Sequence, residues 1–400
     1  MAELAAGELA ARIGAARWFG GGSAAIVEVR VEDELELPGG SRLQVLAVML
    51  EGGDSRRHLW VEGEQTVAAG IVEGLLGGGR RGRFRFEPGR RLSGLAPAGR
   101  RERPVGTDQS NSSRVVEEAL VVKLYRRLWP GTHPEPELGR YLTEIARFDG
   151  VPAFAGTVTW DGCAVAFAQE LVAEAQDGWS WGAAAIATDD IAGMAELGAL
   201  SARLHTALAG LGAGPAPAAR RHAWRSQALA QLDLAARLSG PESARLLRRH
   251  RPRIRRGLEG LVGAGDPVLT RVHGDYHVGQ VLSSPAGLAV IDLEGEPTRS
   301  VVERSAPGCP VRDVAAMLRS FDHLARHVQH ERGPGCERCE SWIDRARAAF
   351  LAGYGPVDRE LLRAFELERE VYEFVYAARF LPGWAYAPRG GLDWLMERAE

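Results

Sequence analysis

The stretch that decides the fold is Val268-Leu-Thr-Arg-Val-His-Gly-Asp275-Tyr-His-Val-Gly-Gln280-Val-Leu-Ser-Ser-Pro-Ala-Gly-Leu-Ala-Val-Ile-Asp292. Two short apolar runs flank a Ser-Pro-Ala-Gly turn, which predicts a β-hairpin that brings one aspartate from each run to the same end. Asp275 can orient an acceptor hydroxyl and take its proton, while Asp292 can bind Mg²⁺ on nucleotide phosphates. The amide oxygen of Gln280 can serve the same metal. The alternative is a structural turn with Asp292 as a cap.

Composition singles out two residues upstream of this stretch. Among the 49 lysine and arginine residues, Lys123 is the single lysine, and Asn111 is the single asparagine in the chain. Where arginine serves as the ordinary cation, a retained lysine indicates a need for a compact ammonium group. Chance retention is the alternative reading.

The residues around Lys123 favour the functional reading. A small polar run, residues 108–113, precedes a β-branched, apolar run at residues 119–125, which predicts a hairpin with a polar tip. Backbone N–H groups and hydroxyls of this tip can meet phosphates above Lys123, and the residues we expect there are Ser110, Asn111 and Ser112.

A helix that begins with proline follows the lysine strand. The stretch His133-Pro-Glu-Pro-Glu-Leu-Gly-Arg-Tyr-Leu-Thr-Glu144 is typical of a helix start. In kinases a helix glutamate pairs with the strand lysine that holds the phosphates. We expect Glu137 to be that partner, with Glu144 as a second possibility.

At this point the sequence resembles a known family. From His273 to Asp292 it is similar to the catalytic core of the aminoglycoside phosphotransferase-like kinases. More narrowly, it resembles the actinobacterial maltokinases and the related glucosamine kinases. The stretches that carry this resemblance are Arg17-Trp-Phe19, Asp108-Gln-Ser-Asn-Ser-Ser113, Ile291-Asp-Leu-Glu-Gly-Glu-Pro-Thr-Arg-Ser, Glu303-Arg-Ser-Ala-Pro, Val311-Arg-Asp-Val-Ala-Ala-Met-Leu-Arg-Ser-Phe-Asp322 and Tyr372-Glu-Phe-Val-Tyr376.

The resemblance implies an α+β, bilobal protein-kinase-like fold with an N-terminal cap subdomain. We expect the cap over residues 1–95, the rest of the N-lobe with its nucleotide-binding sheet and hinge over 96–178, and a mainly helical C-lobe with the catalytic and acceptor sites over 179–400. ATP and Mg²⁺ are the implied cofactors. Backbone groups of Glu170 and Val172 are implied to meet the adenine edge.

We expect much of the acceptor site to be formed by segments that follow Asp292, the expected metal ligand. Besides Asp275 and Gln280, we expect Arg312 and Asp313 to line it, together with an aromatic tail that includes Tyr372 and Trp384. A mixture of hydrogen-bonding groups and rings suits a sugar. Ordinary core packing is the alternative for the tail, and bracing of the catalytic loop is the alternative for Arg312.

Two departures from the maltokinase pattern favour an amino sugar. Glu370 adds a carboxylate that can meet a cationic group, and the bulky Phe380 shortens a disaccharide site. We therefore expect glucosamine as acceptor, forming glucosamine 6-phosphate, ahead of maltose. An aminoglycoside phosphotransferase, or a catalytically silent nucleotide-binding module, is a further alternative. The second is disfavoured because Lys123, Asp275 and Asp292 are all present.

Other features limit the partners and the location. A net charge of -3 gives no reason to expect nucleic acid or an anionic membrane. The arginine-rich stretch at residues 77–104 is interpreted as a solvated boundary. Neither a signal peptide nor a membrane-spanning run is found in the sequence, so a cytoplasmic monomer is expected. The motif Cys336-Glu-Arg-Cys339 leaves a metal hook, an oxidisable thiol pair and chance open.

Overall fold

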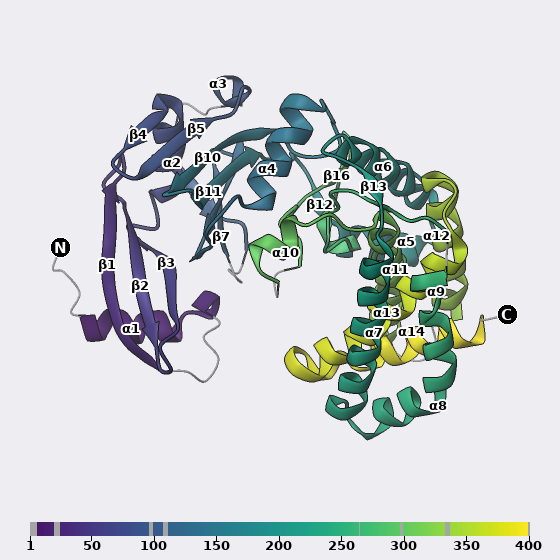
Figure 1. The fold of residues 1–400 in the computed structure, drawn as a ribbon. Coiled ribbons are helices and arrows are strands. Elements are labelled where there is room, and N and C mark those ends of the chain that lie inside the picture. The colour runs from purple at the N-terminus through teal and green to yellow at the C-terminus, as the bar shows by residue number, and fades with distance from the viewer. Residues whose placement is uncertain are drawn as a thin grey trace. The chain divides into compact units, whose positions relative to one another are not determined.

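The computed structural model of the protein describes residues 6–19, 25–95, 99–106, 111–263, 265–296, 299–332 and 337–398. The chain forms two compact units, one of Met1–Ala173 with Thr298–Ser305 and one of Glu174–Pro297 with Ala306–Glu400. Strands dominate the first unit and helices the second (Figure 1). The α+β class expected from the sequence is therefore confirmed.

The first unit begins with a four-stranded antiparallel sheet in the order β1-β2-β3-β9. Its strands are β1 (Ile26–Glu36), β2 (Arg42–Leu50), β3 (Ser55–Glu62) and β9 (Arg127–Leu128). Helix α1 (Ala6–Ala15) covers one face, because its residues Leu9 and Ile13 pack against Leu46 and Val48 of β2.

A seven-stranded sheet forms the rest of the first unit, in the order β4-β5-β10-β11-β8-β7-β6. Its strands are β4 (Gly79–Arg81), β5 (Phe84–Pro88), β10 (Phe154–Trp160), β11 (Cys163–Glu170), β8 (Leu120–Tyr125), β7 (Asn111–Val116) and β6 (Glu102–Pro104). This sheet runs across the boundary expected near residue 95, because β5 pairs with β10 along its length. Both sheets and helix α2 (Val67–Gly77) contribute to one hydrophobic core.

Short helical segments complete the first unit. They are η1 (Arg17–Phe19), α3 (Leu92–Leu95), α4 (Pro134–Arg140), η2 (Tyr141–Ile145) and α10 (Val301–Ser305). Segment α10 comes from the return of the chain after the second aspartate, and it contacts α4. The chain therefore enters the second unit twice, once after residue 173 and again after residue 305.

The second unit is built around helices α11 and α13, which pack against each other. Its helices are α5 (Gly178–Thr188), α6 (Ala192–Ala209), α7 (Ala218–Leu238), α8 (Pro241–Leu258), α9 (Gly260–Gly263), α11 (Pro310–Arg332), α12 (Glu337–Tyr354), α13 (Arg359–Phe380) and α14 (Tyr386–Glu397). Large apolar side chains fill the spaces between them, among them Phe321, Trp342 and Phe374. Within the described part of the chain, no helix is both long and apolar enough to cross a bilayer.

The hairpin predicted from the deciding stretch is present. Strands β15 (Val281–Ser284) and β16 (Gly287–Val290) pair in register, with Ser284 opposite Gly287 at the turn. Strand β12 (Gln176–Asp177) adds a third strand, and β13 (Gly214–Pro215) pairs separately with β14 (Val268–Leu269). The two remaining segments are 3₁₀ turns, η3 (Val278–Gln280) and η4 (Pro382–Trp384).

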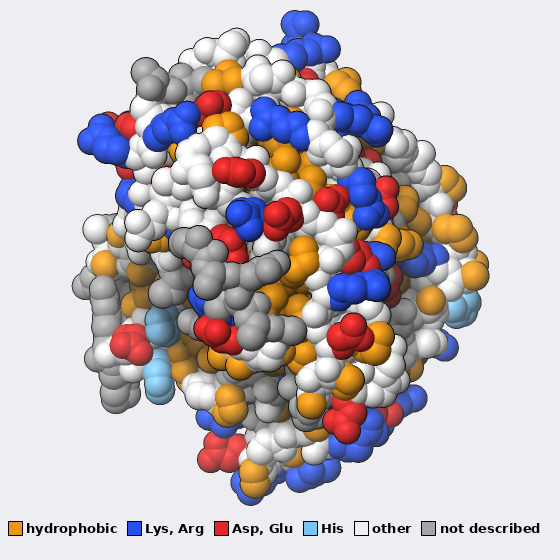
Figure 2. All heavy atoms as spheres, turned by 90° about the vertical axis from the view of Figure 1, so that its left-hand side faces the viewer, with side chains coloured by type: hydrophobic (Ala, Val, Ile, Leu, Met, Phe, Trp, Pro, Cys, Tyr) orange, Lys and Arg blue, Asp and Glu red, His pale blue; other side chains and the backbone are white. Residues whose placement is uncertain are grey.

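Five arginines of the arginine-rich stretch pair with acidic side chains of the first unit. The pairs are Arg83 with Asp161, Arg85 with Glu87, Arg100 with Glu73, Arg101 with Glu117 and Arg103 with Glu118. Figure 2 shows basic and acidic side chains interspersed over the face that it presents. Such mixing is typical of a solvated surface, because a basic patch that binds a polyanion keeps its charges unpaired.

The cysteines divide into two kinds. Cys163 and Cys309 are buried free thiols, whereas Cys339 is disulfide-bonded. Cys336 lies outside the described residues. Among the alternatives for this motif, the structure therefore assigns Cys339 to a disulfide. No cluster of three or more histidine, cysteine, aspartate or glutamate residues suited to a metal occurs in the described ranges.

Candidate active site

Lys123 lies in the middle of β8, opposite Ser113 of β7 and Phe167 of β11. Its Nζ atom is 2.9 Å from Oε2 and 3.2 Å from Oε1 of Glu135. The hydroxyl of Tyr125, two residues further along the same strand face, donates to Oε2 of Glu135 at 2.6 Å. The buried carboxylate of Glu135 thus holds the ammonium group of Lys123 in place.

The structure places Glu135 beside Lys123, whereas the sequence analysis named Glu137; the pairing of Lys123 with Glu137 stays a prediction. Helix α4 begins at Pro134, and the imidazole of its N-cap residue His133 accepts from the backbone N–H of Glu135. This start puts Glu135 in the first turn, directed at Lys123. Glu144 instead accepts a hydrogen bond from the backbone N–H of Arg90 at 2.6 Å.

The polar run is also placed differently from the expectation. Asn111 and Ser112 are the first residues of β7, opposite Tyr125 and Leu124 of β8. The turn between these two strands lies at the other end, at residues 117–119. The run therefore enters β7 from the connection after β6, and it is not the tip of the β7–β8 hairpin. Ser110 lies outside the described residues.

Three expected nucleotide contacts lie in strands β7 and β11 or just after β11. The hydroxyl of Ser112 accepts a hydrogen bond from Nε of the buried Arg126 at 2.7 Å. Glu170 ends β11, and its backbone N–H donates to the carbonyl of Ala153 at 2.9 Å. Val172 is the second residue after that strand. The adenine contacts of Glu170 and Val172 remain predictions.

In the second unit, a buried aspartate holds residues 273–280, which we term the catalytic loop. Asp313 accepts the backbone N–H of His273 at 2.8 Å and that of Gly274 at 3.1 Å. Burial acts to raise the pKa of Asp313, but a hydrogen bond from His205 and the nearby positive charge outweigh it and lower the pKa. Gly274 has a φ of 83°, a left-handed conformation that favours glycine.

Asp275 follows this anchored turn and faces a histidine. Its carboxylate Oδ2 lies 4.0 Å from Nε2 of His277, whose Nδ1 accepts the backbone N–H of Gly279 at 3.1 Å. Burial lowers the pKa of His277. The loop is tied to the hairpin because Nε2 of His273 lies 3.0 Å from the carbonyl of Ile291.

The amide of Gln280 meets the second aspartate. Its Nε2 donates to Oδ2 of Asp292 at 3.2 Å, and its backbone carbonyl accepts the N–H of Ile291 at 3.0 Å. Asp292 has a φ of 63°. A non-glycine residue in this region is uncommon and is often found at functional sites. The hairpin therefore brings Gln280 and Asp292 together, as the sequence analysis predicted.

These two side chains fit a magnesium ion. Carboxylate and amide oxygens are hard donors, and Mg²⁺ in nucleotide sites commonly takes one or two protein ligands with phosphates and water. The proximity of Gln280 and Asp292 provides such a pair. The fit rests on this donor chemistry and on the strained backbone at Asp292.

The residues expected to line the acceptor site differ in exposure. Asp313 is 3 % exposed and lies beneath the catalytic loop. Arg312 donates two hydrogen bonds to Glu368, at 2.9 and 3.1 Å. Glu370 is 2 % exposed, and its carboxylate lies 3.1 Å from Nε2 of His323. Asp313 and Glu370 are thus almost fully buried in this structure, and their places in an acceptor site remain predictions.

Two residues of the aromatic tail, Tyr372 and Trp384, contact other side chains through their rings. Tyr372 lies under the guanidinium of Arg369, whose carbon is 4.9 Å from the ring centroid. Trp384 packs edge-on against Trp179, with 6.0 Å between ring centroids, and in a tilted arrangement against His327, with 5.5 Å between centroids. The sequence analysis did not identify Trp179, the second residue of α5, which contacts the catalytic loop. A Cβ atom at Gly279 would lie 2.9 Å from its Nε1.

Comparisons with known proteins show which family the chain matches and which proteins it is similar to. The model of the phosphotransferase enzyme family (APH) matches residues 101–365. A glucosamine kinase of Mycolicibacterium smegmatis is 33% identical over 409 aligned positions, covering 91% of this chain and 98% of the relative. A glucosamine kinase of Streptacidiphilus jiangxiensis is 34% identical over 341, covering 77% of this chain and 76% of the relative.

A solved structure agrees with the sequence relatives. It is a glucosamine kinase in complex with glucosamine, ADP and inorganic phosphate, with a TM-score of 0.78 and 29% identity. The match covers 92% of this chain and 95% of that one. The resemblance stated from the sequence and the predicted kinase-like fold are both confirmed.

Proposed function

The chain belongs to the phosphotransferase enzyme family, and from that premise we propose that it transfers the γ-phosphoryl group of ATP to glucosamine. The observation that carries the proposal is the similarity to glucosamine kinases over nearly the whole chain, including a structure that holds glucosamine and ADP. The product would be glucosamine 6-phosphate. Lys123, Asp275 and Asp292 supply the charged groups that this chemistry requires.

Each of these residues has a definite task in the proposal. The ammonium group of Lys123, steadied by Glu135, binds nucleotide phosphates. Asp275 orients the sugar hydroxyl and accepts its proton as the new bond to phosphorus forms. Asp292 and Gln280 would hold Mg²⁺, which when bound neutralises charge on the phosphate oxygens. Asp313 keeps the turn before Asp275 in place through its two backbone hydrogen bonds.

Recognition of the amino group is assigned to Glu373 rather than to the buried Glu370. Glu373 lies on α13 and forms an ion pair with Arg319, and 12 % of its side chain is exposed. Burial acts to raise the pKa of Glu373, but Arg319 and nearby histidines outweigh it, so the pKa is lowered and the carboxylate stays charged. The charges of Asp275 and Glu373 both act on His277, which supports a position of the Glu373 carboxylate near the catalytic loop.

The proposal is tested by measuring ADP release with ATP and Mg²⁺ for glucosamine, maltose, glucose and an aminoglycoside, with Asp275→Asn as the background. We expect turnover with glucosamine to exceed that with the other acceptors. Preference for maltose would contradict the amino-sugar assignment, and no release above the Asp275→Asn background would contradict sugar phosphorylation altogether.

A second experiment tests recognition of the amino group of glucosamine. Glu373→Gln is expected to raise KM for glucosamine by about tenfold, because a charged hydrogen bond is lost. The same change should have little effect on KM for glucose. Equal effects on both sugars would show that Glu373 does not recognise the amine.

A further inference from the structure

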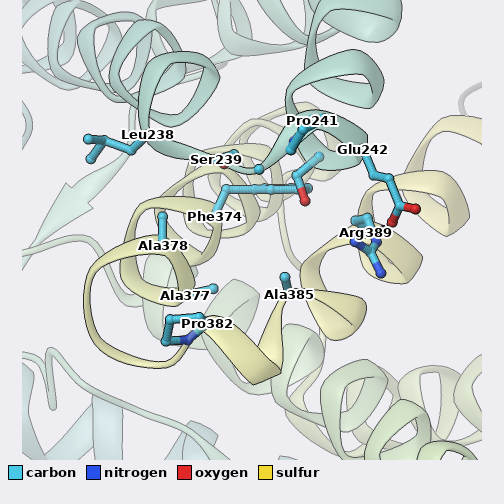
Figure 3. Close-up of a pocket in the computed structure, with 12 residues that line it drawn as sticks. Leu238, Ser239, Pro241, Glu242, Phe374, Ala377, Ala378, Pro382, Ala385 and Arg389 are labelled. Atoms are coloured by element: carbon cyan, nitrogen blue, oxygen red, sulfur yellow. Dashed lines mark ion pairs between the residues drawn. The ribbon is translucent and has the colours of Figure 1, made fainter.

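A cavity of about 560 Å³ lies between the α7–α8 connection and the C-terminal part of α13. It is bounded by the α7–α8 connection, the C-terminal half of α13, η4 and the start of α14 (Figure 3). This volume lies within the range of ordinary small-molecule sites. Its apolar walls include Leu238, Pro241, Phe374, Ala377, Ala378 and Pro382.

One end of the cavity is polar. Arg389 reaches it from α14 and pairs with Glu242 of α8 at 2.8 Å, and Figure 3 shows the two side chains facing each other. Glu242 has a side chain that is 72 % exposed, so this ion pair is a surface contact of small energy. A ligand anion can therefore replace the Glu242 carboxylate on Arg389.

The start of helix α8 also lies at this end and favours an anion. Helix α8 makes its first intrahelical bond from the N–H of Ala244 to the carbonyl of Gly240, so the N–H groups before Ala244 precede the helical bonding pattern. These N–H groups are donors that a ligand oxygen can satisfy.

We propose that this cavity binds a small molecule with an apolar body and a single anionic group, and that the bound ligand modulates the acceptor side of the enzyme. The apolar body would lie along Phe374, Ala378 and Pro382, the apolar side chains with which α13 and η4 line the cavity. The anionic group would pair with Arg389 at the polar end.

The route from the cavity to the catalytic loop is short and lies within the second unit. Pro382, which lines the cavity, and Trp384 both belong to the single turn η4. Trp384 packs against Trp179 at 6.0 Å between ring centroids, and Trp179 lies against Gly279 of the catalytic loop. A ligand that shifts Pro382 therefore shifts a ring that supports the loop. This second half of the proposal rests on the proposed function.

Binding is tested by fluorescence titration with 8-anilinonaphthalene-1-sulfonate, an aromatic anion. Arg389→Gln is expected to weaken binding by about tenfold, because a charged contact is lost. Glu242→Gln should strengthen it, because Arg389 is released from its ion pair. Ala378→Trp should abolish it by filling the cavity. The matched control is Arg249→Gln, which removes an exposed arginine of α8 that does not line the cavity.

Opposite effects of Arg389→Gln and Glu242→Gln, with Arg249→Gln unchanged, would support the site. Equal binding by Arg389→Gln and Arg249→Gln would overturn it, as would wild-type binding by Ala378→Trp when circular dichroism shows the fold to be intact. If Ala378→Trp does not fold, the oppositely directed effects of the two charge variants still decide.

The coupling is tested by measuring KM for glucosamine with and without a saturating concentration of the same probe. A change of about fivefold, present in wild type and absent in Arg389→Gln at the same probe concentration, would support it. An unchanged KM and kcat would overturn the coupling. Should glucosamine not be phosphorylated at all, the proposed function fails, whereas the titrations still decide whether the cavity binds anions.

Discussion

Lys123 and Glu135 form a close ion pair in the first unit, with 2.9 Å between Nζ and Oε2. The carboxylate also accepts the hydroxyl of Tyr125, so three side chains from one strand and one helix form a fixed group. An ammonium held in this way is positioned before any nucleotide arrives, which reduces the entropy lost on binding.

The first prediction separates Glu135 from Glu137. Lys123→Ala is expected to lower kcat/KM for ATP by about a hundredfold or more. Glu135→Gln should lower it by about tenfold, because the ammonium loses its charged partner. Glu137→Gln is the matched control and should leave it close to wild type. Steady-state kinetics at varied ATP would measure this, and a larger loss for Glu137→Gln would contradict the assignment.

A second prediction concerns Asp275. Asp275→Asn removes the proton acceptor with little change in shape and should lower kcat by about 10²–10⁴-fold. KM for ATP should remain near that of wild type, because the side chain acts on the acceptor hydroxyl. Thermal unfolding of both proteins provides the check on folding. Wild-type kcat in Asp275→Asn would show that another group takes the proton.

The third prediction tests the pair of Gln280 and Asp292 as magnesium ligands. Activity should disappear with a chelator and return when Mg²⁺ is added. Asp292→Asn should raise the Mg²⁺ concentration needed for half-maximal activity by about tenfold or more. Gln280→Ala should raise it less, because a neutral amide contributes less to cation binding than a carboxylate. An unaltered Mg²⁺ requirement in Asp292→Asn would exclude it as a ligand.

The pair of His323 and Glu370 makes stability depend on pH. Burial acts to lower the pKa of His323, but the Glu370 charge and hydrogen bond outweigh it and raise the pKa above 6.5. Burial raises the pKa of Glu370 as well. Both shifts mean that the folded state holds more protons than the unfolded one, so the free energy of unfolding falls as pH rises.

We therefore expect denaturant unfolding to show declining stability as the pH rises from near 6.5, the ordinary pKa of histidine. Glu370→Gln removes the carboxylate that stabilises the charged histidine and should flatten or reverse this decline. The matched control is Glu331→Gln, on an exposed position of α11. Equal slopes for wild type and Glu370→Gln would contradict the role of the pair.

Local patterns in the sequence were sufficient to predict the catalytic hairpin. The run from His273 to Asp292 contains both of its strands and their turn, so the partners of each residue lie nearby in the chain. Composition was sufficient to single out Lys123. The helix that supplies its partner was also recognised, because proline near its start is a local feature. These properties depend on neighbours in sequence, and the resemblance to a known family agreed with them.

The tertiary structure alone decided the remaining features. The orientation of Glu135 toward Lys123 depends on how α4 packs beside β8. The sequence does not show which glutamate at the start of α4 this packing directs at the lysine. From the sequence, Asp313 and Glu370 were expected to line the acceptor site. A charged residue in a sequence does not show whether it is buried, because burial depends on helices that are far apart in the chain. The same holds for the contact of Trp384 with Trp179 and for the cavity beside α13, since both arise where segments separated by more than a hundred residues meet.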